Sequence, residues 1–374
     1  FGAGADKADG ALRILQRRVG TGGPALMRQA MAEDATDPRI KVAWAQALSG
    51  DGKKAEAVVQ FRAAAAQNHA EANYELYDTH KSYDRGDVNK TPLVSRVEAE
   101  RSLRKAAELG HPYSMWILAV LLDRGSTVKR DPEGAILWAE RALAKPPKDT
   151  SQADIEVRLG HFLAKSDKPE NKVRGMNILE RYARSRGDAQ SFLALALRGS
   201  DPARARTLLE QAVKTYPGHA VPTLADMLIK GEGGPANPQR AVSLLHGRGA
   251  SDVPEVRGML GRLLAEGRHV PRNVAEGARL ISGWARWDHE ARLELMGLLS
   301  ADPDVRLDYP AGFLYDATEA AELNEPGAML ALIDLKLSEN KQFADRPGGC
   351  ALAERAVQRG DTGGRQRLQA CRAK

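Results

Sequence analysis

Residues 108–142 read ELGHPYSMWILAVLLDRGSTVKRDPEGAILWAERA, and this stretch decides the fold because its pattern returns along the chain. A leucine-rich segment ends at a glycine, an Asp-Pro pair follows, and alanines then recur on a second segment. Further copies are centred on Gly231 and Gly267. The turns that open the copies recur about every 36 residues and lie near Asp37, Ala70, His111, Gln152, Asp188, His219, Asp252, His289, Glu325 and Asp361. Self-similarity at this period predicts a solenoid of helical pairs.

Each recurring position has a physical reason. The first helix carries leucines at i and i+4, such as Leu118 and Leu122, which form one apolar stripe. Gly125 follows, and glycine takes the left-handed conformation that ends a helix at little cost. Asp131-Pro132 then supplies an N-cap side chain and a proline at the first helical position. The second helix is expected to cross its partner closely through small residues two turns apart. These are Ala99 and Ala106, Ala135 and Ala142, and Ala205 and Ala212.

This combination resembles the Sel1-like repeat family, a relative of the tetratricopeptide repeats. The resemblance implies an all-α fold, a right-handed α-solenoid superhelix of about nine helix pairs. We expect one continuous array over residues 37–374, with N-terminal capping helices in residues 1–36. The unit from Gln152 to Arg186 departs from the pattern, because it has Ser166-Asp167-Lys168-Pro169 in place of the loop glycine.

Composition and charge limit the kinds of partner. The net charge is +6, but the 55 basic and 49 acidic residues are interleaved, as on the outer faces of helices. Because no basic run carries interleaved aromatic residues, we expect no nucleic-acid partner. No stretch has the ~18 consecutive apolar residues of a membrane span. The chain begins at Phe1, so we expect an upstream segment that carries the localisation signal and any lipid for membrane association.

The sequence contains no catalytic signature. It has neither a phosphate-binding loop nor a dinucleotide fingerprint nor a Gly-x-Ser-x-Gly elbow. Its eight histidines are scattered, and no His-Glu-x-x-His or Cys-x-x-Cys occurs. We therefore predict no catalytic residue, no cofactor and no metal site. An alternative is an enzyme that binds or modifies polysaccharide on a toroid of helical pairs. Its nearest candidate residues are Tyr309, His289 and Arg292.

Two aromatic residues are candidates for partner binding. Aromatic residues make up only 5% of the chain, and exposed ones tend to anchor interfaces. Trp287 and Tyr309 are the candidates, with core packing as the alternative reading of this aromatic group. Phe313 and Leu314 align with Leu137 and Trp138, and we expect them to fill the core between helices.

The two cysteines, Cys350 and Cys371, lie on either side of a turn at Gly360-Asp361. Each is about ten residues from that turn, so an antiparallel helix pair would bring them to the same end, which is suitable for a disulfide. The alternative is two buried thiols. A disulfide would pin the terminal helix and would imply an oxidising compartment such as a periplasm.

A solenoid of helix pairs offers a long concave face on which protein partners bind. The resemblance to Sel1-like proteins implies a non-catalytic adaptor, and in bacteria the family includes scaffolds for exopolysaccharide assembly and secretion. We therefore expect a periplasmic scaffold in such a complex. The main alternative is a cytoplasmic regulator that sequesters a signalling protein, for which the cysteines would be reduced.

Overall fold

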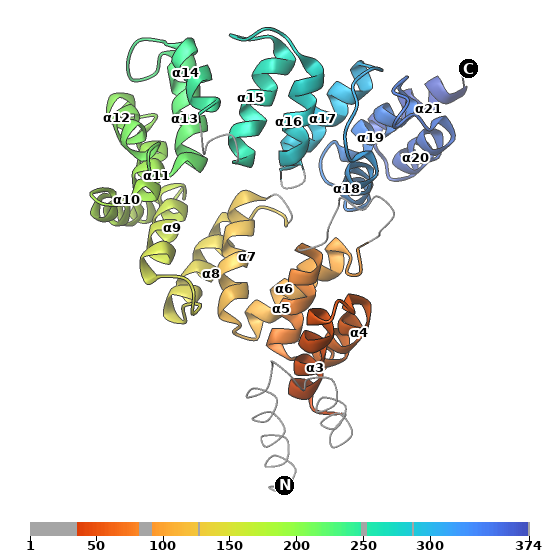
Figure 1. Cartoon of the computed structure of the whole chain (residues 1–374), viewed down its shortest axis with the longest axis horizontal. Helices are drawn as coiled ribbons and strands as arrows, with labels where there is room; N and C mark the ends of the chain where they lie inside the picture. Colours follow the sequence, from red (N-terminus) through yellow and green to blue (C-terminus); the bar gives the residue numbers. More distant parts are fainter. Residues whose placement is uncertain (1–35, 82–91, 126–127, 248–252, 286–287, 373–374) are drawn as a thin grey trace, which may run out of the picture. The chain divides into compact units, whose positions relative to one another are not determined.

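The structure is a computed structural model that describes residues 36–81, 92–125, 128–247, 253–285 and 288–372. Within these ranges all regular secondary structure is helical (Figure 1), which confirms the predicted fold class. The predicted capping helices of residues 1–36 lie almost entirely outside the described ranges. The right-handed superhelix stays a prediction.

The described helices follow one another in pairs. We call the first helix of a pair the A helix and the second the B helix. The A helices are α3 (Pro38–Gly50), α5 (Ala70–Lys81), α7 (Pro112–Arg124), α9 (Gln152–Ala164), α11 (Gly187–Leu197), α13 (Pro217–Lys230), α15 (Pro254–Glu266), α17 (His289–Ala301), α19 (Ala328–Leu337) and α21 (Thr362–Arg372). The B helices are α4 (Lys54–Ala65), α6 (Arg96–Glu108), α8 (Pro132–Ala144), α10 (Pro169–Ala183), α12 (Pro202–Ala212), α14 (Pro238–Leu245), α16 (Val274–Ala285), α18 (Pro310–Glu322) and α20 (Arg346–Gln358).

Every A helix begins within a few residues of a turn predicted from the sequence. The helices form nine pairs from α3 to α20, and α21 is the last helix of the described chain. Its solvent side carries Arg365, Gln366 and Gln369, which are exposed. The exposed side of α21 is therefore polar.

The helices divide into two compact units, with the boundary at Ile155–Glu156. In the first unit, a core around Phe61 joins α3 to α6. In the second unit, one core centred on Phe192 and another on Leu295 both include side chains of α16. The single continuous array over residues 37–374 stays a prediction.

The alanines predicted at the helix crossings are buried. Ala106, Ala135, Ala142, Ala205 and Ala212 are all 0% exposed, and Ala99 is 2% exposed. Burial this complete leaves space only for a methyl group, so the close packing expected of these positions is present in both units.

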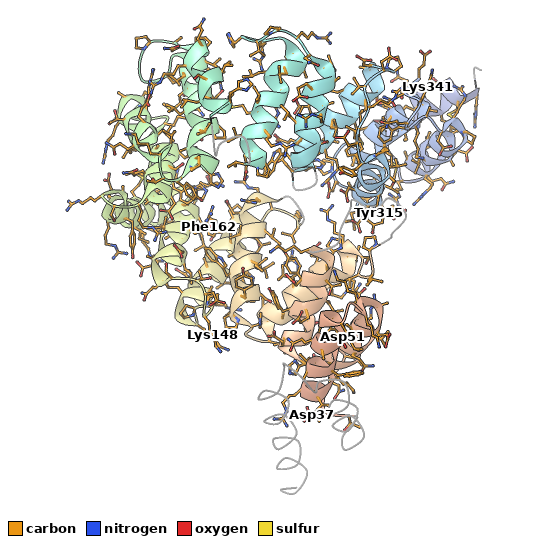
Figure 2. All side chains as sticks on the ribbon, viewed as in Figure 1. Asp37, Asp51, Lys148, Phe162, Tyr315 and Lys341 are labelled. Carbon is orange, nitrogen blue, oxygen red and sulfur yellow. A yellow bond between two sulfur atoms is a disulfide. The ribbon has the colours of Figure 1, made fainter. Side chains whose placement is uncertain are left out.

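The predicted helix ends are formed by the expected groups. Gly125, Gly231 and Gly267 follow A helices with φ values of 70°, 71° and 69°, the left-handed region that favours glycine. At the start of α8, Asp131 Oδ1 accepts a hydrogen bond of 2.9 Å from the Gly134 amide. Asp37, labelled in Figure 2, caps α3 in a related way through the Arg39 amide, at 2.7 Å.

Glycines replace alanine where α15 crosses α16. A Cβ atom added at Gly277 would lie 2.7 Å from the Gly261 carbonyl oxygen and 2.9 Å from the Ala265 amide nitrogen. Both contacts are with backbone, which cannot move aside as a flexible side chain can. The two helices therefore approach as closely as they do only because these residues lack side chains.

We predict that Gly277→Ala lowers the free energy of unfolding of the second unit by about 1–3 kcal/mol through overpacking. The matched control is Gly297→Ala in α17, where an added Cβ meets nothing within 4 Å. That substitution should stabilise by about 0.5–1 kcal/mol, because alanine is the better helix former. Urea unfolding of both variants measures the difference. If Gly277→Ala and Gly297→Ala change the free energy of unfolding equally, the close approach of α15 and α16 at Gly277 is contradicted.

In the α9–α10 pair, which lacks the loop glycine, a serine holds the turn between the two helices. Ser166 is 2% exposed, and its Oγ accepts hydrogen bonds from the Lys168 amide at 3.3 Å and from Asn171 Nδ2 at 3.1 Å. These bonds hold the turn before α10 without a left-handed residue.

Candidate functional site

Side chains from three successive A helices of the first unit meet on one face. Along α5 they are spaced three and four residues apart, which places them on the same side of the helix. We call this surface the acidic face, and it consists of Glu71, Tyr74, Glu75 and Asp78 of α5, Gln46 of α3 and Tyr113 of α7. Gln46 is exposed, and the others are half-buried. The surface is thus accessible from solvent while its side chains are held by neighbours.

Contacts between the helices fix the side chains of the acidic face. Gln46 Nε2 donates a hydrogen bond of 2.7 Å to Glu75 Oε1. His111 Nε2 lies 3.1 Å from Glu71 Oε2. The ring of Tyr74 stacks on the His111 ring, with centroids 4.7 Å apart, and meets the edge of Tyr113 at 5.7 Å. The rings and carboxylates therefore have defined positions before any partner binds.

The surroundings on this face are unfavourable for the ionised form of Glu75. Burial raises the pKa of Glu75, and the charges of Glu71 and Asp78 act in the same direction. Burial and nearby carboxylates also raise the pKa of Tyr74, and they raise the pKa of Tyr77 to about 12. The hydrogen bond with His111 lowers the pKa of Glu71. Like charges that stand one turn apart repel each other, so Glu71 and Asp78 make the ionised form of Glu75 less favourable.

Three carboxylates on the A helices of the second unit, Asp226, Glu294 and Asp334, are paired with arginine. Arg262 Nε of α15 lies 2.6 Å from Glu294 Oε2 of α17. Arg198, which follows α11, bonds both Asp226 and Glu232. Arg367 of α21 bonds Asp334 of α19. Adjacent A helices of this unit are thus linked by ion pairs, whereas Glu75 is linked to α3 by a neutral amide.

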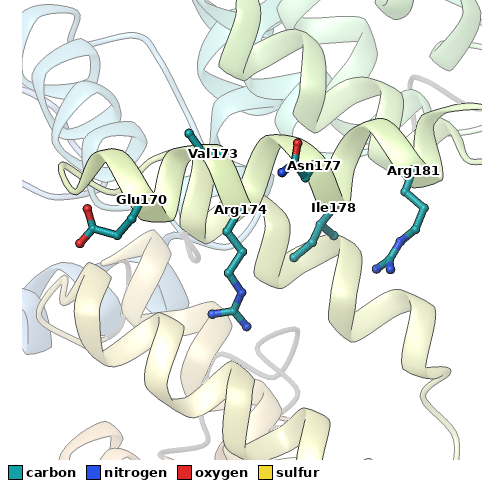
Figure 3. A pocket seen from close by; sticks show the side chains of 6 residues that line it. All are labelled: Glu170, Val173, Arg174, Asn177, Ile178 and Arg181. Atoms are coloured by element: carbon teal, nitrogen blue, oxygen red, sulfur yellow. The ribbon is translucent and has the colours of Figure 1, made fainter.

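A depression runs along α10 in the second unit (Figure 3). Its lining residues are Glu170, Val173, Arg174, Asn177, Ile178 and Arg181. Val173 is 61% exposed, and Arg181 also pairs with Glu156 at 2.5 Å. All six residues belong to one helix, and they combine apolar, acidic and basic groups without a nucleophile held against a base. We assign no reaction to this depression.

A row of aromatic rings joins three A helices of the second unit. His161 of α9 stacks on Phe192 of α11, with centroids 4.3 Å apart, and His219 of α13 lies 5.5 Å from the same phenylalanine. His161 is 8% exposed. Burial lowers its pKa well below the usual value, and the charges of Lys165, Arg158 and His219 act in the same direction. Packing in this row therefore favours the neutral form of His161.

This histidine should make the second unit sensitive to acid. The unfolded chain binds a proton at His161 below about pH 6.5, whereas the folded chain resists it, so stability falls as the pH falls through that value. Between pH 7 and 5.5 we expect the parent to lose about 1 kcal/mol more than His161→Phe. Thermal unfolding across this range measures the slope. His246→Gln, at an exposed histidine, is the control and should follow the parent.

Of the two residues predicted to bind a partner, the structure describes Tyr309 but not Trp287. Tyr309 is 58% exposed and directly precedes α18, so its ring is accessible, and its role in binding stays a prediction. Trp287 lies outside the described residues. Phe313 is 9% exposed and belongs to the core, as expected.

One alignment made from the sequence was wrong. Leu137, which was matched with Phe313, is 47% exposed. Counted from the proline that begins each helix, Phe313 corresponds to Ala135 of α8, which is fully buried. The position on the helix, rather than the local run of apolar residues, decides which side chain faces the core.

Two residues considered for an enzyme site join neighbouring helix pairs. His289 Nδ1 and Arg292 Nη1 of α17 lie 2.8 Å and 2.7 Å from the same oxygen of Glu325, which precedes α19. Arg292 is 2% exposed, too buried to reach a bound substrate. This geometry is that of a buried ion pair between successive A helices.

The structure brings Cys350 and Cys371 together as a disulfide with Cα atoms 5.8 Å apart. The bond joins α20 to the last turn of α21, where Arg346 Nη2 also donates to the Ala370 carbonyl at 2.8 Å.

In the described ranges, no group of three His, Cys, Asp or Glu side chains could hold a metal ion. None of the helices in these ranges has both the length and the apolar character needed to cross a bilayer.

The acidic face was not identified from the sequence. Its signal was the run of Glu71, Tyr74, Glu75 and Asp78 at helical spacing. The spacing alone gives a polar stripe on a helix, which is ordinary at a surface. Only the contacts with Gln46 and Tyr113 show that neighbouring A helices extend the stripe into a surface.

Comparison with known proteins agrees with the repeat pattern. The Sel1 repeat model matches residues 112–146 and 224–246, one stretch in each unit. No curated protein matches the sequence. A Sel1 repeat protein from Oxalobacter formigenes is 21% identical, with 83% of this chain and 89% of that chain covered and a TM-score of 0.42.

Two other solved structures are similar over most of the chain. A protective antigen of uropathogenic Escherichia coli with an SLR fold is 16% identical, with coverage of 91% of this chain and 73% of that one and a TM-score of 0.41. Yeast Tom70 is 14% identical, with coverage of 99% and 87% and a TM-score of 0.43. The chain thus carries two stretches that match the Sel1 repeat, and its described helices follow one another in the sequential pairs of a tetratricopeptide-like repeat fold.

Proposed function

We propose that this protein is a non-catalytic scaffold that holds other proteins on the faces of its A helices. The acidic face carries this proposal. Three successive A helices place charged groups and aromatic rings there at fixed positions, with no reactive pair among them. Rings and charged groups held in this way are the usual anchors of protein interfaces. Tyr309 is a second contact point in this proposal, and Trp287 is proposed on the sequence alone.

The proposed compartment is the periplasm, and the disulfide supports it. A bond between Cys350 and Cys371 persists where the surroundings are oxidising. The proposed complex is one for exopolysaccharide assembly or secretion, an assignment supported by the Sel1 repeats through family resemblance. In this setting the scaffold gathers components of the export machinery and performs no reaction on the polymer.

Photo-cross-linking in the native cells tests the scaffold function. A photoreactive amino acid at Tyr113 or Tyr309 should give discrete cross-linked bands that contain a component of the envelope. The same group at Lys148, an exposed loop residue (Figure 2), should not. Equal, diffuse labelling from all three positions would contradict a defined binding face. Turnover of uronate oligomers by the purified chain would support the enzyme alternative instead.

Blocking free thiols in intact cells before lysis tests the compartment. A periplasmic protein should contain no free thiol until it is denatured and reduced. Labelling of both cysteines without reduction would support the cytoplasmic regulator and contradict the periplasmic assignment.

A further inference from the structure

Helix α21 is attached to the second unit by few buried side chains. Among its residues, Thr362–Arg372, only Gly364 is buried, and a glycine has no side chain to bury. Leu368 is partly buried against the core that α19 and α20 share. The A helices α17 and α19 bury five residues each. Because apolar burial supplies most of the stability of a packed helix, packing alone holds α21 weakly.

Two glycines bring α21 close to its neighbours. A Cβ atom added at Gly363 would lie 2.6 Å from Leu330 Cδ1 of α19, and one added at Gly364 would lie 2.9 Å from Ala356 Cβ of α20. The helix therefore covers Leu330 and Ala356, and it packs on both α19 and α20 (Figure 1). An 11-residue helix with two adjacent glycines in its first turn is unstable when it is detached.

An ion pair also connects α21 to α19. Arg367 Nε donates a hydrogen bond of 2.7 Å to Asp334 Oδ1. The Asp334 side chain is 45% exposed, so water screens the pair and its contribution to stability is small. The covalent bond between Cys350 and Cys371 is therefore the strongest link between α21 and the rest of the unit.

The disulfide lies where an external thiol can reach it. Neither cysteine is buried. Arg346 Nη2 donates to the carbonyl groups of Ala370, at 2.8 Å, and Cys371, at 3.4 Å, which holds the guanidinium near the bond. A nearby positive charge stabilises a thiolate, and a stabilised thiolate is the better leaving group in thiol–disulfide exchange. These surroundings favour reduction of the bond in the folded protein.

We infer that α21 is a redox-operated clasp, which a dithiol releases from α19 and α20 by reducing the Cys350–Cys371 bond while the rest of the second unit stays folded. A thiolate of the dithiol attacks one cysteine sulfur and forms a mixed disulfide, and the other cysteine leaves as a thiolate that takes up a proton. The second thiol of the dithiol then displaces the bound cysteine. The clasp gains two electrons and two protons, and the dithiol becomes a disulfide.

Release of α21 changes the surface of α19 and α20. Leu330 and Ala356 become accessible, and Asp334 loses its contact with Arg367. The oxidised protein keeps this surface covered, so the two redox states present different faces to solvent. The clasp does not depend on the scaffold function, which the cross-linking experiment tests separately.

Trypsin cleavage of the full chain in both redox states tests the clasp. Cleavage after Arg365 or Arg367 requires α21 to leave its neighbours, because a protease needs a locally unfolded chain. After reduction with dithiothreitol and alkylation of the thiols, this cleavage should be roughly a hundredfold faster. Cleavage after Arg279, an exposed arginine of α16 in the same unit, should not change. Reoxidation of reduced, unalkylated protein with oxidised glutathione should restore the resistance of α21.

A double variant with Cys350→Ser and Cys371→Ser controls for other effects of the reductant. Trypsin should cleave its α21 at the rate of the reduced parent, with or without dithiothreitol. Circular dichroism confirms that the variant is folded. The alkylated parent gives the same comparison without any substitution.

Equal cleavage of α21 in the oxidised and reduced parent would overturn the clasp, as would resistance of the double serine variant. A parallel rise in cleavage after Arg279 would also overturn it, because the second unit would then unfold as a whole. So would a bond that dithiothreitol reduces only after denaturant is added. A rise confined to α21 and reversed by reoxidation supports the clasp, whatever cross-linking shows about the scaffold.

Discussion

Replacing Asn340 with leucine should lower the free energy of unfolding of the second unit by about 3 kcal/mol or more, because buried carbonyl groups would lose their donor. Asn340 is 0% exposed. Its Nδ2 lies 3.1 Å from the Leu299 carbonyl oxygen, 3.2 Å from that of Asp302 and 2.9 Å from that of Val305. The side-chain amide of Asn340, in the loop between α19 and α20, thus donates to backbone carbonyl groups at the end of α17 and in the loop that follows α17.

Two further substitutions show whether hydrogen bonding is the cause. Asn340→Asp keeps the size of the side chain but removes the donors, so it should destabilise about as strongly as leucine. Asn177→Leu changes an exposed amide on α10 of the same unit and should alter stability by less than about 0.5 kcal/mol. Urea unfolding, with hydrogen exchange to report on α17 to α20, measures all three. If Asn340→Asp lowers the free energy of unfolding only slightly while Asn340→Leu lowers it strongly, the shape of the side chain rather than its three hydrogen bonds determines the stability.

Removing the disulfide should have the second large effect. Replacing Cys350 and Cys371 with serine opens a covalent loop with a sequence separation of 21 residues, which should cost about 3 kcal/mol through the entropy of the unfolded chain. The loss should be greatest in α21, because the bond ties this helix to α20 and the helix packs on α19 and α20.

Hydrogen exchange measures this loss locally. In the double serine variant, or in the reduced parent, the amides of α21 should exchange faster, whereas those of α11 should not change. Ion pairing between Arg367 and Asp334 should keep part of the protection. If α21 exchanges equally with and without the bond, the disulfide has no role in holding the terminal helix.

Much of the fold followed from short-range chemistry. The left-handed glycines, the Asp-Pro starts and the alanines two turns apart each specify a local geometry, and the structure places all three as expected. These features act within one helix pair, so the sequence of that pair is enough to predict its helix ends and its helix crossing. The C-terminal cysteine pair was predictable for the same reason, because one turn relates the two helices.

Contacts between pairs could not be predicted in this way. The acidic face depends on Gln46 meeting Glu75 across a whole intervening helix, and the Asn340 contacts depend on two loops about one repeat apart. The match of Leu137 with Phe313 failed because similar apolar runs were aligned without reference to the helix start. Register between repeats decides these contacts, and short sequence patterns do not specify it.

Hydrogen exchange of the protein alone and with the partner identified by cross-linking tests the central claim most directly. The account predicts added protection in α3, α5 and α7, where the acidic face lies, with little change in the B helices α4, α6 and α8. It also predicts that the partner is recovered chemically unchanged. Protection confined to the B helices, or a partner that is modified during incubation, would contradict a scaffold that binds through its A helices.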